Sequence, residues 1–219
     1  MKGDSEEFSQ GELVFFGKVA ASVSHELSNV ISTIHQVCGL LEDLIAAFER
    51  GEPVSIERLK KIHGRLYRQT ARGIDVIQNL NRFSHTVDER PVQFEVNKVI
   101  GNLISVTRRF ADMKDVHLQV DYSAEELLIV NDPFRLQQVV FLALSRALEA
   151  TTRNDELRIT VQKNTEGPSV KILAPRPAEV EEKDSQKELL QDLARQLNST
   201  ICFRRDDDFE IILLQISSD

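Results

Sequence analysis

The chain has 219 residues, of which 41% are hydrophobic and 28% are charged, a composition typical of a folded globular protein. Its formal net charge of −8 makes nucleic acid an unfavourable partner, because the non-specific part of that binding needs clustered Lys and Arg. The polar N-terminus lacks the apolar core of a signal peptide, and no uninterrupted run approaches the roughly 20 apolar residues that span a bilayer. We therefore expect a cytoplasmic protein with no membrane segment.

The first predicted element is a long helix from Leu13 to Phe48. Its apolar residues are separated by alternating steps of three and four, which is the spacing of a heptad seam. The seam residues are Leu13, Phe16, Ala20, Val23, Leu27, Val30, Ile34, Val37, Leu41, Leu44 and Phe48. So long an apolar seam needs a packing partner along its whole length.

A turn is predicted after this helix, because the stretch Arg50–Pro53 contains a glycine and a proline. Ser55 can cap a second helix, which continues to about Asp88–Pro91 and carries apolar side chains at helical spacing. Two long helices joined by a short turn form an antiparallel hairpin. Pairing of two hairpins across a two-fold axis buries both apolar faces. We therefore predict that residues 1–90 form a dimerisation domain, which is a four-helix bundle in the homodimer.

After Pro91 the pattern changes, and helical stretches alternate with short strand-like runs. Helices are predicted for Val96–Met113, Pro133–Thr151 and Ser185–Leu197. Strands are predicted for Val116–Tyr122, Leu127–Val130, Leu157–Gln162, Val170–Leu173, Thr200–Arg204 and Glu210–Ile216. This order predicts that residues 91–219 form a two-layer α/β domain, with one sheet covered by helices on at least one face.

The first helix contains a candidate for chemistry at His25. With Ala20 and Leu27 at heptad position a, His25 falls at position f, opposite the seam, and is expected to face solvent. Glu26 follows it directly, and Asn29 lies one turn further along the same face. A neutral imidazole is nucleophilic, and an adjacent carboxylate can orient it and accept its proton. The position alone also fits a surface histidine with no chemical task.

The string Ala21-Ser22-Val23-Ser24-His25-Glu26-Leu27-Ser28-Asn29 resembles the H-box of sensor histidine kinases. The resemblance extends over the hairpin, roughly Leu13 to Arg90, and implies a dimerisation and histidine phosphotransfer domain. It implies that His25 is the phosphorylated residue and that Glu26 assists removal of its proton. It also implies that Asn29 aligns a water molecule that dephosphorylates a partner's aspartyl-phosphate.

The second half of the chain resembles the ATPase domain of the same kinases. The stretch Asn131–Val140 looks like the start of the helix that bears their magnesium-binding Asn. In this register the position of that Asn is occupied by Arg146. A guanidinium has no acceptor atom, so Arg146 cannot ligate Mg²⁺.

The adenine-reading acid and the glycines of those kinases should follow the predicted strand Val170–Leu173. The sequence there is Ala174-Pro175-Arg176-Pro177-Ala178, with neither an acid nor a glycine. Glycine allows the close backbone approach that a phosphate-binding lid needs. The resemblance thus implies a retained fold with a degenerate nucleotide site near Arg146 and Ala174. We expect this chain to bind no metal ion and no cofactor, and to be an unlikely partner for ATP.

These features predict a phosphotransfer protein similar to the dimeric bacterial histidine phosphotransferases. In this interpretation, His25 exchanges phosphate with the aspartates of response-regulator receiver domains, and each receiver brings its own Mg²⁺. Two alternatives stay open. One is an ATP-dependent histidine kinase core with an atypical nucleotide site. The other is a pseudokinase scaffold, or a phosphatase that uses Glu26 and Asn29 on a response regulator.

Overall fold

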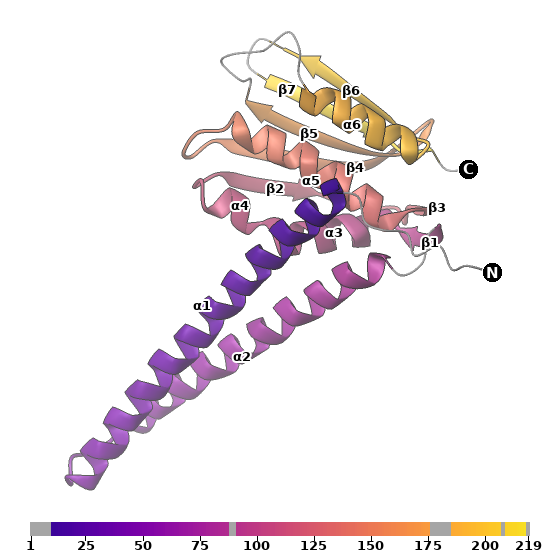
Figure 1. The fold of residues 1–219 in the computed structure, drawn as a ribbon. Coiled ribbons are helices and arrows are strands. Elements are labelled where there is room, and N and C mark those ends of the chain that lie inside the picture. The colour runs from indigo at the N-terminus through magenta and orange to yellow at the C-terminus, as the bar shows by residue number, and fades with distance from the viewer. Residues whose placement is uncertain (1–9, 88–90, 176–184, 207–208, 218–219) are drawn as a thin grey trace.

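The structure is a computed structural model that describes residues 10–87, 91–175, 185–206 and 209–217. A long helical hairpin projects away from an α/β domain (Figure 1). The hairpin consists of α1 (Gln10–Glu49) and α2 (Ile56–Ser84), and α2 is followed by the 3-10 turn η1 (His85–Val87). The two predicted helices and the turn between them are confirmed.

The turn of the hairpin is closed by backbone hydrogen bonds. Gly51 adopts a φ of 80°, a left-handed conformation that glycine accepts without strain. The N–H of Glu52 then donates to the carbonyl of Ala47 at 3.0 Å, which ends α1 in a Schellman motif. Ser55 precedes α2 but makes no side-chain cap, contrary to the prediction. Its hydroxyl instead donates to the carboxylate of Glu57 at 2.6 Å, and this bond holds the pKa of Glu57 below its ordinary value.

Part of the predicted seam is buried inside the hairpin of a single chain. Val30, Val37 and Leu44, all at heptad position d, are buried, and Val37 and Leu44 pack with Ile62 of α2. Between His25 and the tip of the hairpin, the seam residues at position a are only half-buried or exposed. The hairpin therefore covers one side of its apolar seam and leaves another side open.

The α/β domain has two layers, with α3, α5 and α6 on one face of the main sheet (Figure 1). This sheet has the strand order β2-β4-β5-β7-β6, with β2 parallel to β4 and the other neighbours antiparallel. The helices are α3 (Val96–Thr107), α4 (Arg109–Asp112), α5 (Pro133–Glu149) and α6 (Ser185–Gln196). The strands are β1 (Val92–Glu95), β2 (His117–Asp121), β3 (Leu128–Asn131), β4 (Glu156–Asn164), β5 (Gly167–Pro175), β6 (Thr200–Arg205) and β7 (Phe209–Gln215). The predicted fold class, a helical hairpin followed by a two-layer α/β domain, is confirmed, and the dimeric four-helix bundle stays a prediction.

Two details of this domain differ from the prediction. The strand β3 lies outside the main sheet and pairs with β1, a strand that was not predicted. The helix predicted for Val96–Met113 is divided into α3 and α4. The carboxylate of Glu95 explains the sharp start of α3, because it accepts the backbone N–H groups of Asn97 and Lys98 at 3.0 and 2.7 Å.

An aromatic cluster joins the hairpin to the α/β domain. The ring of Phe15 in α1 lies 5.4 Å from the rings of Phe83 in α2 and Phe134 in α5. It also lies 5.0 Å from the ring of Phe141 in α5. These side chains belong to one continuous hydrophobic core that both parts of the molecule share. The boundary between residues 90 and 91 stays a prediction, since residues 88–90 lie outside the described part.

The expectation of no membrane segment stays a prediction, and the composition of α1 bears on it. α1 is long and apolar enough to cross a bilayer by length and composition, with a mean hydropathy of 1.3 over an 18-residue stretch. The helix reaches this mean with polar residues interspersed among the apolar ones, so no long uninterrupted apolar run marks it in the sequence. A helix at the centre of a helical bundle meets the same criterion, and α1 packs along α2 in the hairpin.

Candidate functional site

His25 lies midway along α1, and its side chain is exposed, as heptad position f predicts. The seam residues before and after it are buried or half-buried on the opposite side of the helix. The helix therefore holds the imidazole on its outer face, where a second protein can reach it.

Asn29 is in direct contact with His25. Its amide nitrogen Nδ2 lies 3.2 Å from Nδ1 of the ring, one helical turn away. The backbone carbonyl of Asn29 accepts the hydroxyl of Thr33 at 2.9 Å, a contact that leaves the Asn29 amide free to serve His25. An amide N–H donates, so it favours the tautomer of His25 that carries its proton on Nε2. Rotation of the amide presents Oδ1 instead and favours the tautomer with a free Nε2 lone pair.

Glu26 is adjacent to His25 but is bound to another partner. Its carboxylate accepts two hydrogen bonds from Arg72 of α2, at 3.1 and 3.3 Å. These two hydrogen bonds join the carboxylate to α2 rather than to the imidazole. A small cavity of about 120 Å³ lies beside this ion pair, and Asp75 and Asn79 of α2 also line it. The structure therefore brings Asn29 to His25 and brings Glu26 to Arg72, a residue that sequence reasoning did not identify.

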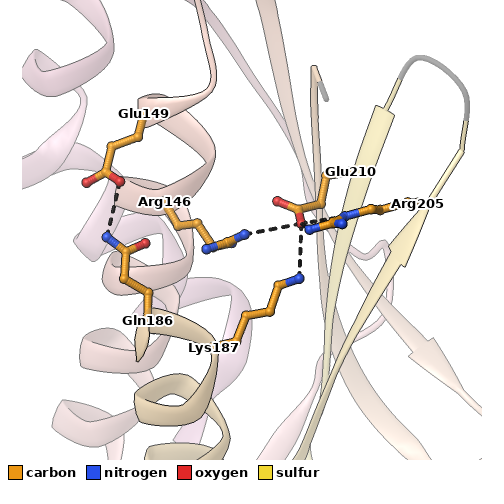
Figure 2. Close-up of polar contacts among 6 residues, drawn as sticks. All are labelled: Arg146, Glu149, Gln186, Lys187, Arg205 and Glu210. Carbon is orange, nitrogen blue, oxygen red and sulfur yellow. Dashed lines mark hydrogen bonds and ion pairs between the residues drawn. The ribbon is translucent and has the colours of Figure 1, made fainter. Parts of the chain in front are cut away.

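A second cluster lies at the predicted degenerate nucleotide site, between α5, α6 and the sheet (Figure 2). The carboxylate of Glu210 in β7 is 2% exposed and faces three cations. Arg146 of α5 approaches it to 3.4 Å, Arg205 of β6 to 3.5 Å and Lys187 of α6 to 3.7 Å. A buried carboxylate needs such pairing to offset its lost hydration.

Arg146 and Ala174, the two residues by which the sequence marked the degenerate nucleotide site, both lie near Glu210. Ala174 of β5 is buried and lies directly opposite Glu210 in the β5–β7 register. The cations of Arg146 and Lys187 lie 5.8 and 5.1 Å from the ring centre of Phe203. Arg146 and Ala174 are therefore close in space, but they surround a carboxylate from the same chain that sequence reasoning missed.

Some residues discussed from sequence lie outside the described part of the chain. These include Arg176, Pro177 and Ala178 of the stretch after β5. Within the described ranges, no group of three or more His, Cys, Asp or Glu side chains is arranged to hold a metal ion.

The sequence matches no protein-family model and no curated protein. Solved structures do match the fold. A histidine kinase from Burkholderia phymatum is 13% identical with a TM-score of 0.52, and the match covers 96% of this chain and 99% of that one. AdeS, a histidine kinase of Acinetobacter baumannii, is 14% identical with a TM-score of 0.51, covering 84% of this chain and 96% of that one. The catalytic domain of histidine kinase ThkA is 16% identical with a TM-score of 0.52, covering 59% of this chain and 98% of that domain.

These matches define the class of fold. A long N-terminal helical hairpin is followed by a mixed α/β domain of the kinase ATPase type, and His25 lies on the hairpin. The chain therefore has the fold of a histidine kinase core, as its resemblance to these kinases implied.

Proposed function

We propose that the chain is a histidine phosphotransfer protein of a two-component phosphorelay. The observation that carries this proposal is the exposed imidazole of His25, fixed by Asn29 on the outer face of a histidine-kinase-like hairpin. The partner is a response-regulator receiver domain that carries an aspartyl-phosphate. The receiver would supply the Mg²⁺ that neutralises charge on the phosphoryl group.

The proposed reaction exchanges one bond to phosphorus for another. Nε2 of neutral His25 attacks the phosphorus, and the bond between phosphorus and the aspartyl oxygen breaks with its electron pair on that oxygen. The attack needs the tautomer with the proton on Nδ1, which Oδ1 of Asn29 can accept as a hydrogen bond. The reverse reaction passes the phosphoryl group from His25 to a second receiver aspartate.

The cluster around Glu210 supports a function that does not use ATP. Arg146 replaces a metal-ligating amide with a cation, and this cation is directed toward Glu210. Three cations and an internal carboxylate occupy the region between α5, α6 and β7 (Figure 2). An ATP-dependent kinase core remains the first alternative.

A phosphatase acting on a response regulator is the second alternative, and the position of Asn29 favours it. An exposed amide beside His25 can hold a water molecule against the phosphorus of a docked aspartyl-phosphate without changing its own charge. In that reaction the phosphoryl group goes to water, and His25 takes up no label.

A homodimer is part of the same proposal. Large apolar side chains of the hairpin remain exposed in the single chain, where a second copy can cover them. They include Ile31, Ile45 and Phe48 of α1 and Ile56, Leu59, Ile74 and Ile77 of α2. The proposed dimer acts in the cytoplasm, where receiver domains are found.

The test is a transfer experiment with two phosphate donors. The protein is incubated with receiver domains carrying labelled aspartyl-phosphate, and separately with labelled ATP and Mg²⁺. We expect acid-labile label on the chain from a receiver and none from ATP, and no label on His25→Ala from either donor. Label from ATP alone would favour the kinase. Receiver dephosphorylation without label on the chain would favour the phosphatase.

A further inference from the structure

A cavity lies where the start of α1 packs against α5 and α6 of the α/β domain (Figure 1). Its volume is about 580 Å³, within the range of sites that hold a small molecule. Most of its wall is apolar. The apolar lining residues are Val14 and Phe15 of α1, Phe141 and Leu142 of α5, and Leu189 and Leu193 of α6. The hairpin and the α/β domain therefore both contribute to this cavity.

The cavity is separate from the two sites described above. Within the described part of the chain, none of the charged residues of the Glu210 cluster lines it, and neither does His25. Gly11 and Lys18, which do line it, fall at heptad position f, as His25 does. The side of α1 that presents the imidazole thus meets the cavity about 10 Å further toward the N-terminus of the helix.

One buried polar group in the wall of this cavity lacks a partner. Gln138 of α5 lines the cavity and is only 2% exposed. Among the described residues, no group donates a hydrogen bond to its side-chain oxygen Oε1. A buried acceptor without a partner costs free energy, and such acceptors are rare in folded proteins. The cavity therefore offers an acceptor for a donor that a ligand can supply.

The charged side chains around the cavity largely neutralise one another. Arg135 approaches the carboxylates of Glu12 and Asp132, at 3.6 Å in both cases. Lys18 is exposed, and its ammonium lies 5.9 Å from the ring centre of Phe141, where water also solvates it. This balance favours neither an anion nor a cation as the ligand.

We propose that this cavity binds a small neutral molecule with an apolar ring system and one hydrogen-bond donor, such as a hydroxyl group. The rings cover the apolar wall between α1, α5 and α6, and the hydroxyl donates to Oε1 of Gln138. A water molecule serves this oxygen less well, because an apolar wall offers it few other polar partners. The bound molecule joins the hairpin to the α/β domain. This inference goes beyond the proposed function and does not depend on it.

The test measures binding of the full chain to matched naphthyl probes. The probe is 2-naphthol at pH 7, and its control is 2-methylnaphthalene, which has a similar shape but no donor. The chain contains no tryptophan, so the fluorescence of the naphthyl group reports binding directly. We expect saturable binding of 2-naphthol, about fivefold tighter than that of 2-methylnaphthalene, as one neutral hydrogen bond provides. 2-Naphthoate and 2-naphthylmethylammonium should each bind more weakly than 2-naphthol.

Gln138→Met removes the acceptor with little change in side-chain volume. The preference for 2-naphthol should be lost, whereas binding of 2-methylnaphthalene should be kept. The thermal unfolding midpoint should not fall, because no hydrogen bond to Oε1 is removed. The matched control is Gln196→Met, at an exposed position of the lining, which should keep the preference.

A second pair of variants tests the apolar wall. Leu189 is 48% exposed at the mouth of the cavity, and Leu189→Ser should weaken binding of both naphthyl probes about threefold or more. Leu128→Ser, at a similarly exposed position of β3 outside the lining, should leave both unchanged.

The outcomes that contradict the proposal are distinct. Absence of saturable 2-naphthol binding, or a preference that survives in Gln138→Met, would overturn the site. Equal weakening by Leu189→Ser and Leu128→Ser would do the same, even if Gln138→Met failed to fold. Tighter binding of either charged probe would overturn the choice of a neutral ligand. Binding only after removal of residues 1–9 would show that the chain itself fills the cavity.

Discussion

Nδ2 of Asn29 lies 3.2 Å from Nδ1 of His25, so an amide and an imidazole on the exposed face of α1 are joined by a hydrogen bond. This amide can face the ring or a water molecule above it, but one N–H cannot fully serve both. The same side chain therefore influences two reactions of a docked aspartyl-phosphate. It sets the tautomer of the nucleophile, and it can position water for hydrolysis.

The first prediction concerns Asn29→Ala. Loss of the amide should slow hydrolysis of the receiver's phosphate by about tenfold or more, since no group then holds the attacking water. Transfer to His25 should be largely retained, because the ring nitrogens remain. In ¹⁵N NMR spectra, the His25 signals should move toward a mixture of tautomers. Equal loss of transfer and hydrolysis in Asn29→Ala would contradict this division of roles.

The second prediction concerns the pair between Glu26 and Arg72. If Glu26 takes a proton during transfer, Glu26→Gln should slow the step about 10²-fold. Arg72→Gln leaves that carboxylate in place, so transfer at saturating receiver should stay near the wild-type rate. Since Arg72 is 61% exposed, its loss should lower the free energy of unfolding by no more than about 1 kcal/mol. If both variants slow transfer equally at saturation, Glu26 serves to hold Arg72 rather than to accept a proton.

The third prediction concerns the proposed dimer. Ile45 is 51% exposed in the single chain, and its place on α1 belongs to the face left open by α2. Ile45→Glu would place a charge in the buried centre of a four-helix bundle, at a cost of several kcal/mol. Light scattering should then show a monomer that keeps its helical content. Gln36→Glu, on an exposed polar face of the same helix, should remain a dimer.

The long elements could be predicted because their signals repeat. The seam of α1 offers the same spacing over five heptads, and Gly51 with Pro53 marks the turn. The strand β1 has only four residues, Val92–Glu95, too few for alternation to stand out. Its pairing with β3 depends on contacts between segments that are distant in sequence, and no local pattern reports those.

The site was predictable to the same extent. Heptad position f predicts that His25 is exposed, and the spacing of four residues places Asn29 on the same face of the helix. Both predictions depend on a single helix. Arg72 and Glu210 could not be found in this way. Arg72 forms an ion pair with Glu26 only because of the register between α1 and α2. Glu210 forms an ion pair with Arg146 across the interior of the α/β domain. Each is an ordinary charged residue in its own segment.

The last prediction concerns Glu210, which is 2% exposed and contacted by three cations. Glu210→Gln would leave Arg146, Lys187 and Arg205 facing one another without the carboxylate that attracts them. Removal of one partner from a buried ion pair costs about 3 kcal/mol, because the remaining charge is neither hydrated nor paired. Chemical denaturation should therefore show a loss of this size in the free energy of unfolding.

The matched control is Glu188→Gln, on an exposed position of α6, which should change the free energy of unfolding by less than about 0.5 kcal/mol. Sulfate should restore stability to Glu210→Gln more than to the wild type, because an anion can take the place of the lost carboxylate. ATP should stabilise the variant, if at all, without dependence on Mg²⁺, since Arg146 cannot ligate a metal. A variant as stable as the Glu188 control would mean that the three cations do not depend on Glu210. Magnesium-dependent stabilisation of the wild type by ATP would show that the nucleotide site has been retained.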